Sequence, residues 1–305
     1  MTNRVQSVVL ALAFAGAAHA QQVPDRGYRA ANPAPLYARD SGPVVCVDEA
    51  HFNFHTMGER FWAFAELLRQ DGYQIRANAA KFSAATLASC RVLVISNAQP
   101  NNEDWDTYPY PTPSAFSDPE IAAVKLWVEG GGALLLIADH MPLAGAAARL
   151  ATAFDVEFMD GFAMREPHTD APDIFRRTDE TLRDHVITRG RSAREAVTSV
   201  RTFTGQAFRA PHAQPLLVLS AGYVLLLPEK AWTFTPETRR VPVAGWLQGA
   251  VQPVGKGRAA FFGEAAMFSA QLAGPERMPM GMNAPGAETN FQLTLNLLHW
   301  LTGTL

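Results

Sequence analysis

The chain has 305 residues, of which 48% are hydrophobic and 18% are charged, with a formal net charge of −3. A chain of this length and composition can bury a substantial core, either as one large α/β domain or as one domain with an elaboration. Because no basic run or Lys/Arg-rich segment accompanies the near-neutral charge, we expect no nucleic-acid partner.

The first 20 residues predict a signal peptide. Arg4 gives a positive amino end, residues 8–17 are apolar, and residues 18–20 (Ala-His-Ala) offer the small residues of a cleavage site. The apolar run is too short to span a bilayer and no later run is long enough, so we expect no transmembrane segment in the mature chain. The mature protein should therefore begin at Gln21 and be periplasmic or secreted.

Residues 21–42 are rich in Pro, Ala, Arg and Gly without a period, which predicts a linker. Strand-length apolar runs then alternate with helical patterns. The predicted strands are 43–48, 73–77, 91–97, 133–138 and 156–158, and the predicted helices are 58–70, a short one capped by Ser83, one from 118 to Gly130, and 143–154. Apolar strands separated by helices predict a parallel sheet that is covered on both faces.

After about residue 160 the pattern becomes richer in β-strands, which predicts an elaboration at about 160–257 of a domain spanning 43–305. The predicted strands there are 197–203, 216–219, 223–227 and 241–247. A last core strand at 258–263, a helix at 265–272 and an amphipathic helix at 289–301 complete the pattern.

Polar side chains crowd the exits of three predicted strands. In open α/β sheets ligands bind outside the carboxyl ends of the strands, so these side chains are candidates for one shared site. The candidate catalytic residues are Asp48, Glu49, His51, Asp139, His140 and Glu264. For any one of them the alternative is a solvated loop with carboxylates that cap helices.

Two kinds of chemistry fit this set. Mixed His and carboxylate ligands suit Zn²⁺ or a similar divalent ion, and the candidate ligands are His51, His55, Asp139 and His140. No HExxH pair supports the metal, and the alternative is a metal-free site in which Asp139 or Glu49 orients a His general base. Serine catalysis is disfavoured because the chain has no Gly-x-Ser-x-Gly elbow. His168 and Asp170 belong to a polar loop that could reach the site.

Aromatic and amide side chains predict contacts to a ligand. Asn101, Trp105 and Tyr108 lie in the long loop 97–117, and Asn53 follows the first strand. Such side chains can stack on and hydrogen-bond a small-molecule or carbohydrate-like ligand. The alternative is a Pro-rich loop whose aromatic rings pack on the domain.

The chain contains two cysteines, which makes a cysteine-based zinc site improbable. Cys46 falls in the middle of a predicted strand and Cys90 directly precedes another, so we expect two buried thiols. A disulfide is the alternative in an oxidising compartment.

The segment 121–150 resembles the nucleophile-elbow region of class I glutamine amidotransferases. It has a helix, Gly130-Gly131-Gly132, an apolar strand, a sharp turn and a small-residue helix. That family has Ile-Cys-Ala-Gly where this chain has Ile137-Ala138-Asp139-His140. The resemblance implies a doubly wound, mostly parallel, flavodoxin-like α/β sheet, here with a β-rich C-terminal elaboration, but no cysteine-dependent amide transfer.

The chain more narrowly resembles a group of exported bacterial proteins of unknown function that carry an amidotransferase-like domain. The resemblance rests on residues 48–51, 138–140, 263–268 and 290–300. Two functions fit: a hydrolase that acts on a small polar or carbohydrate-like substrate, or a non-catalytic module that binds such a ligand. A purely structural scaffold explains the polar strand exits least well.

Overall fold

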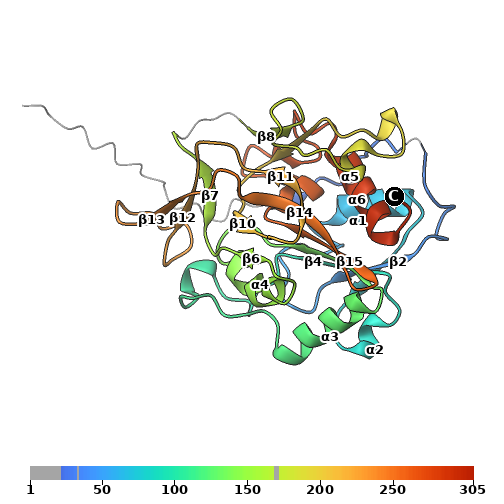
Figure 1. Ribbon diagram of the computed structural model, residues 1–305, viewed down its shortest axis with the longest axis horizontal. Coiled ribbons are helices and arrows are strands. Elements are labelled where there is room, and N and C mark those ends of the chain that lie inside the picture. The colour runs from blue at the N-terminus through green and yellow to red at the C-terminus, as the bar shows by residue number, and fades with distance from the viewer. Residues whose placement is uncertain (1–21, 33, 168–171) are drawn as a thin grey trace, which may run out of the picture.

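The computed structural model describes residues 22–32, 34–167 and 172–305 (Figure 1). The predicted signal peptide, residues 1–20, lies outside the described residues, as do His168 and Asp170. Within the described part of the chain, no helix has the length and apolar character needed to cross a membrane. The described chain is a mixed α/β structure with a mostly parallel central sheet and three smaller antiparallel sheets.

Five parallel strands form the centre of the molecule, and they lie in the order β3-β2-β4-β5-β15. Numbered along the chain from the first of them, this order is 2-1-3-4-5. Because β4 and β5 are buried on both faces, their sequences are apolar apart from Ser96 at the end of β4, in keeping with the prediction. The bounds are β2 (Val44–Asp48), β3 (Gln74–Asn78), β4 (Val92–Ser96), β5 (Ala133–Ile137) and β15 (Gly257–Phe262).

Helices cover both faces of this sheet. On one face α1 (Trp62–Gln70) and α6 (Asn290–Thr302) pack against Val45, Val47 and Leu135. On the other face α3 (Asp118–Glu129) and α4 (Leu143–Thr152) pack against Leu134 and Leu136, next to α2 (Ala84–Leu87). Figure 1 shows α2, α3 and α4 together below the sheet. Alternate residues of β5 thus face the two halves of the core.

Beyond β15 the central sheet continues with antiparallel strands: β14 (Leu247–Val254), β11 (Gln214–Val218), β10 (Phe208–Arg209) and β6 (Glu157–Phe158). The smaller sheets are β7 (Phe162–Arg165) with β12 (Tyr223–Leu227) and β13 (Arg239–Pro242), β8 (Asp173–Arg176) with β9 (Ser199–Thr202), and β1 (Gln22–Pro24) with β16 (Ala270–Ala273) and β17 (Met278–Gly281). The remaining elements are α5 (Val186–Arg189) and 3-10 helices at Trp105–Thr107, Ala193–Glu195 and Ala266–Phe268.

Two predicted elements were wrong. The strand predicted at 241–247 is interrupted by a turn in which Gly245 has φ +83°, so its residues divide between β13 and β14. The helix predicted at 265–272 is a 3-10 turn followed by β16, which pairs with β1 and β17. In both places pairing with distant strands outweighs the local preference of the sequence.

The segment predicted as a linker packs on the domain. It contains β1, whose three residues pair with β16, and the Tyr37 ring lies 5.1 Å from the Tyr73 ring. Asp71 accepts hydrogen bonds from Asn32 Nδ2 and Leu36 N, both at 2.9 Å. These contacts hold Asn32, Leu36 and Tyr37 against the end of α1 and the residues that follow it.

The two cysteines are bonded to each other, so the expectation of two thiols was wrong. Cys46 lies in β2 and Cys90 directly precedes the neighbouring strand β4, which places their Cα atoms 5.7 Å apart. That separation suits a disulfide. The prediction failed because the sequence did not reveal that these two strands are neighbours.

Candidate functional site

The strand register brings the predicted polar exits to one edge of the sheet. Ile137 at the end of β5 pairs with both Ser96 of β4 and Phe262 of β15. The residues that follow these strand ends, including Asn97, Asp139 and Glu264, therefore leave the sheet side by side. Asp48 ends β2 at the same edge, one strand further on.

Asp139 and Glu264 form a pair of carboxyl groups at this edge. Glu264 is buried, and its two oxygens accept hydrogen bonds from Ala266 N at 2.7 Å and Met267 N at 2.9 Å. Asp139 is half-buried as a residue, but its Oδ1 is enclosed and has no hydrogen-bond partner among the described residues. Gly205 packs against Glu264, and a Cβ at that position would collide with the Gly263 carbonyl oxygen.

Burial raises the pKa of Asp139 to about 7, although the hydrogen bond from Asn97 opposes the shift. Burial and the charge of Asp139 together raise the pKa of Glu264 well above its ordinary value. Two carboxyl groups that repel each other in this way cannot both ionise readily. The pair therefore holds a proton near neutral pH and can exchange it.

His140 follows Asp139 and lies in a cluster of aromatic rings. Its ring stacks on Phe162 at 4.5 Å and meets the edges of Trp232 at 4.7 Å and Trp105 at 5.7 Å. Nδ1 lies 2.7 Å from the Met141 carbonyl oxygen, which can only accept, so Nδ1 carries the hydrogen and Nε2 carries the lone pair. Burial lowers the pKa of His140 to about 4, against the effect of this hydrogen bond, so the ring is neutral at pH 7.

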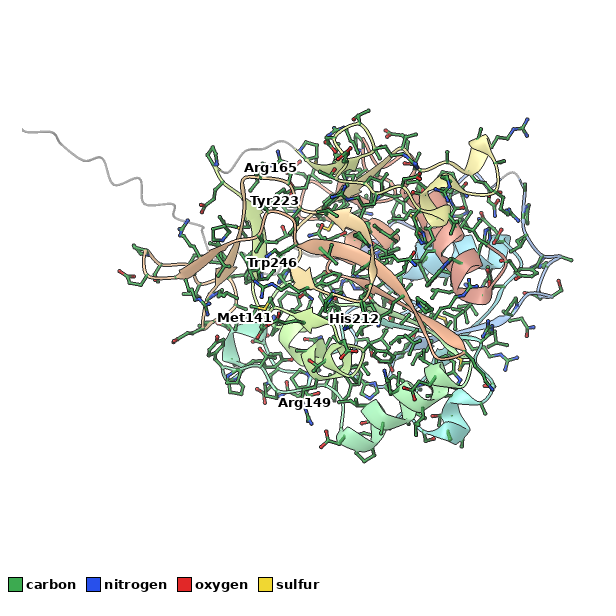
Figure 2. The ribbon with its side chains drawn as sticks, in the orientation of Figure 1. Met141, Arg149, Arg165, His212, Tyr223 and Trp246 are labelled. Atoms are coloured by element: carbon green, nitrogen blue, oxygen red, sulfur yellow. A yellow bond between two sulfur atoms is a disulfide. The ribbon has the colours of Figure 1, made fainter. Side chains whose placement is uncertain are left out.

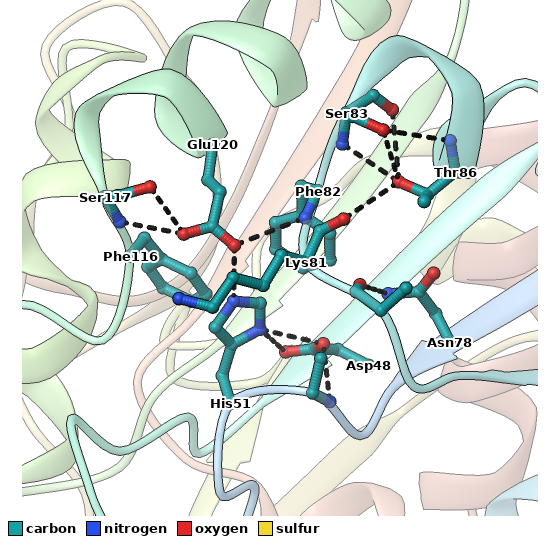
Figure 3. Close-up of polar contacts among 12 residues, drawn as sticks. Asp48, His51, Asn78, Lys81, Phe82, Ser83, Thr86, Phe116, Ser117 and Glu120 are labelled. Atoms are coloured by element: carbon teal, nitrogen blue, oxygen red, sulfur yellow. Dashed lines mark hydrogen bonds and ion pairs between the residues drawn. The ribbon is translucent and has the colours of Figure 1, made fainter.

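Asp48 and His51 belong to a second cluster, which Figure 3 shows. His51 Nδ1 lies 2.9 Å from Asp48 Oδ2, and His51 Nε2 lies 2.9 Å from Glu120 Oε1. All three side chains are buried, and the imidazole contacts the rings of Phe82 and Phe116, which also stack on each other. The cluster ties the exit of β2 to the first turn of α3.

Burial lowers the pKa of His51, but the hydrogen bonds and charges of Asp48 and Glu120 outweigh it and raise that pKa. Burial raises the pKa of Glu120, but bonds from Ser117 and His51 lower it to about 2. Both ring nitrogens of His51 face carboxylate oxygens, which accept, so the arrangement favours the protonated ring that donates from both. Both of its nitrogens are engaged, so it is not placed to act as a general base.

The other residues at the first strand exit also have structural contacts. Glu49 accepts from Met57 N at 2.8 Å, and Asn53 Nδ2 donates to Asp48 Oδ2 at 3.0 Å and to the Ser96 carbonyl at 3.3 Å. His55 is buried with Nδ1 3.2 Å from Ser96 Oγ, and burial with the nearby charge of Arg60 lowers its pKa to about 3. None of the three joins Asp139 and Glu264.

The structure does not bring the predicted metal ligands together. His51 is engaged by Asp48 and Glu120, His55 by Ser96, and His140 by the Met141 carbonyl. Across residues 22–32, 34–167 and 172–305, no group of three or more His, Cys, Asp or Glu side chains is arranged to hold a metal ion. The donor set proposed from sequence therefore does not fit Zn²⁺.

In the loop 97–117, Gln99 organises the predicted ligand-binding residues. Its Oε1 accepts from Trp105 Nε1 at 2.7 Å and from the Tyr108 hydroxyl at 3.2 Å. Tyr108 is buried and also donates to the Asn101 carbonyl at 2.9 Å, and burial raises its pKa to about 12. Trp105 is half-buried and reaches His140, whereas Asn101 makes a local turn with Glu103 N.

Arg165, Asp173 and Tyr223 form a polar group on the β-rich elaboration. Arg165 Nε is 3.6 Å from Asp173 Oδ1, the Tyr223 hydroxyl donates to Asp173, and Figure 2 shows Arg165 beside Tyr223. The charge of Asp173 is among the influences that raise the pKa of Glu264. These residues come from the β-rich elaboration, which therefore contributes to the environment of the pair.

Sequence reasoning missed four residues of this edge: Asn97, Gln99, Glu120 and Trp232. Ser117-x-x-Glu120 has the spacing of a capping box, and Glu120 does contact Ser117 N and Oγ, but nothing in the sequence connects it to His51. Trp232 comes from the loop between β12 and β13, and no local signal places that loop over the exit of β5.

No family model matches the chain, and no curated protein matches it. Among solved structures, the mmIFT52 N-terminal domain matches with a TM-score of 0.60 at 12% identity, covering 85% of this chain and 97% of that domain. The two share a fold. At this identity the match shows nothing about activity.

Other structural neighbours have lower TM-scores. The cytoplasmic protein STM3548 from Salmonella typhimurium matches at 0.49 and 16% identity, covering 85% of this chain and 98% of that one. A ThuA-like protein from Bacteroides uniformis ATCC 8492 matches at 0.46 and 13% identity, covering 89% and 95%. The neighbours thus include ThuA-like proteins at low identity.

Proposed function

We propose that the protein is an exported hydrolase that acts on a small polar or carbohydrate-like substrate through Asp139 and Glu264. The observation that carries the proposal is the carboxyl pair itself: Glu264 is buried, Oδ1 of Asp139 is enclosed, and both groups have raised pKa values at the edge of the sheet where α/β proteins bind ligands. Carboxyl groups whose surroundings raise their pKa values toward neutrality are suited to proton transfer at physiological pH.

We assign the substrate contact to Asp139, because the residue is half-buried and its Oδ1 has no hydrogen-bond partner among the described residues, whereas both oxygens of Glu264 accept backbone hydrogen bonds. As a carboxylate, Asp139 removes a proton from the attacking water while the water oxygen bonds to the substrate. It then returns that proton to the leaving oxygen or nitrogen as the substrate bond breaks. Glu264, fixed by two backbone N–H groups, positions the pair and sets the charge of Asp139.

His140 supplies a hydrogen-bond acceptor beside Asp139. Because Nδ1 is committed to the Met141 carbonyl and the ring is neutral, Nε2 can accept a hydrogen bond from a substrate hydroxyl. Asp48, His51 and Glu49, predicted as catalytic, take structural roles in this proposal.

We also propose a fold type and a cellular compartment for the protein. The strand order 2-1-3-4-5 with helices on both faces supports a doubly wound, flavodoxin-like sheet of the amidotransferase type, with Asp139 near the elbow position where that family has its cysteine. The Cys46–Cys90 disulfide supports an oxidising compartment, in keeping with a periplasmic or secreted protein.

The test is hydrolysis of a panel of nitrophenyl esters and nitrophenyl glycosides by the protein, its Asp139→Asn and Glu264→Gln variants, and a Glu49→Gln control. We expect Asp139→Asn to lower the rate about 100-fold or more, whereas the control keeps the wild-type rate. Glu49 is the matched control because its carboxylate contacts Met57 N instead of the pair. Equal rates in Asp139→Asn and wild type would overturn the proposal. Ligand binding without turnover of any substrate would support the alternative, a binding module.

A further inference from the structure

Two exposed aromatic residues near the candidate site have an unusual backbone conformation. Phe52 is 53% exposed with φ +47°, and Trp232 is 45% exposed with φ +63°. Bulky residues avoid positive φ because their Cβ approaches the backbone, and such strain is found preferentially at functional sites. The Phe52 ring gains little from burial, whereas the Trp232 ring contacts His140 and Phe162 and still leaves close to half of the residue exposed.

These two residues and Trp105 form what we call the aromatic rim. The Phe52 carbonyl accepts from Gln99 Nε2 at 2.7 Å, and Gln99 Oε1 accepts from Trp105 Nε1 at 2.7 Å. Trp105 and Trp232 both contact the His140 ring. Loops from three places in the sequence thus contribute to the rim, and its two tryptophans contact His140, the residue that follows Asp139.

An ion pair joins the two tryptophan-bearing loops. Lys230 Nζ lies 3.3 Å from Asp106 Oδ2, and both side chains are more than half exposed. Gln99, His140 and these charges lie among the rings, so the rim is a set of separate ring faces with polar groups between them. A membrane surface or a protein partner favours a continuous apolar patch instead.

A saccharide chain has the complementary chemistry. Each sugar ring offers an apolar C–H face that can lie on an aromatic ring and hydroxyl groups around its edge that hydrogen-bond neighbouring polar groups. We propose that the aromatic rim binds an oligosaccharide of at least two sugar rings, one on Trp232 and another on Phe52. This inference rests on the proposed function, since it names the substrate class of the same site.

The test is binding of oligosaccharides to the full chain carrying Asp139→Asn, which prevents turnover, by calorimetry and tryptophan fluorescence. The probes are cellohexaose, maltohexaose, xylohexaose and chitohexaose, each beside its monosaccharide. We expect at least one hexasaccharide to bind with a dissociation constant of about 1 mM or tighter. Its monosaccharide should bind about tenfold more weakly or worse, because it can occupy only one ring face.

Variants in the rim separate this proposal from general effects. Trp232→Ala and Phe52→Gly should each weaken binding about tenfold, while Trp232→Tyr, which keeps a ring and preserves folding, should retain it. Trp246→Ala is the matched control. Trp246 is half-buried under Arg209, and it lines an open groove of about 900 Å³ together with His212. Figure 2 labels both residues.

The outcomes are distinct. Failure of every hexasaccharide to bind, or equal binding by Phe52→Gly and the parent, would overturn the saccharide inference. If no hexasaccharide binds but the protein hydrolyses a non-sugar substrate in a reaction that requires Asp139, the proposed function still holds. Saccharide binding by a protein whose wild type hydrolyses nothing would support the rim and overturn the hydrolase proposal.

Discussion

Asn97 and Asp139 hold each other through two hydrogen bonds across neighbouring strands. Asn97 Nδ2 donates to Asp139 Oδ2 at 2.8 Å, and Asp139 N donates to Asn97 Oδ1 at 2.9 Å. Asn97 has φ +50°, a conformation that Asn adopts more readily than most residues. One side chain thus holds both the backbone N–H and one carboxyl oxygen of Asp139, and it leaves Oδ1 without a hydrogen-bond partner among the described residues.

The carboxyl pair predicts a pH dependence of stability. The pKa of Asp139 is about 7 in the folded protein and 3.8 ordinarily, so between these values the folded state binds more protons than the unfolded state. The contribution of Asp139 to stability is therefore complete below about pH 4 and is lost as the pH rises toward 7. Asp139→Asn should remove this loss. The difference in unfolding free energy between the variant and wild type should therefore grow as the pH rises from about 4 to 7, by at most about 1.4 kcal/mol per pH unit for each proton.

Urea unfolding of the two proteins between pH 4 and pH 8 measures this difference. A comparison with a variant is needed because His140, with a pKa of about 4, and His55, with a pKa of about 3, make stability rise with pH over part of the same range. Asp118→Asn is the control, since the Asp118 side chain is 74% exposed. A constant difference between Asp139→Asn and wild type would show that the carboxyl pair does not share a proton.

The buried cluster of Asp48, His51 and Glu120 should be important for stability. Removing one partner leaves a buried charge uncompensated, so Glu120→Ala should cost about 3–5 kcal/mol of unfolding free energy, and Asp118→Ala in the same helical turn much less. Because the pKa of Glu120 is about 2 in the folded protein and 4.5 ordinarily, its contribution should be lost as the pH falls through this interval.

The milder variant Glu120→Gln has a second readout. It keeps an acceptor for His51 Nε2 but removes a negative charge, so the pKa of His51 should fall, which an NMR titration of the imidazole signals would detect. An unchanged His51 pKa would contradict the ion cluster.

Reduction of the disulfide should destabilise the protein. Cys46 and Cys90 are 44 residues apart, and closing a loop of this size contributes about 2–4 kcal/mol, chiefly by restricting the unfolded chain. Denaturation with and without a thiol reductant measures the effect, and a Cys46→Ala/Cys90→Ala double variant should show no response to reductant. If wild-type stability is insensitive to reduction, the bond is absent from the protein in solution.

Phe52→Gly should not destabilise the protein, although it deletes a large side chain. Phe52 is exposed and has positive φ, which glycine adopts without steric cost. We therefore expect the unfolding free energy of the variant to equal that of wild type or to exceed it by up to about 1 kcal/mol. Phe54→Gly is the contrasting variant, because Phe54 packs on Trp105 and His55 and its loss should destabilise. Thermal unfolding compares the three proteins.

The leader remains a prediction. Residues 18–20 have the small residues of a signal-peptidase site, so amino-terminal sequencing of exported protein should begin at Gln21. Exported protein that retains Met1 would contradict it.

Much of the central sheet could be predicted from sequence because β4 and β5 are short, almost entirely apolar and bounded by turn residues. The same patterns gave the positions of Asp139 and Glu264 at strand ends. What could not be predicted was the pairing of strands: the disulfide depends on β2 lying beside β4, and β16 depends on β1, which is about 250 residues earlier.

Within the site, sequence reasoning could not tell buried from exposed polar groups. Asp48 and His51 occupy a strand exit, as Asp139 does, but a contact with Glu120 encloses them, and that contact joins residues 69 positions apart. The contact between Asn97 and Asp139 could not be predicted either, because the sequence shows only that both residues follow strands.

The neighbouring strands β5 and β15, which end shortly before Asp139 and Glu264, are separated by about 120 residues of chain. During synthesis β15 is made only after the whole β-rich elaboration. Until then one edge of β5 has no strand to pair with. Contacts this distant in sequence form slowly. The candidate site is therefore among the last parts of the molecule to assemble, and nascent chains that have not reached β15 are those most exposed to aggregation.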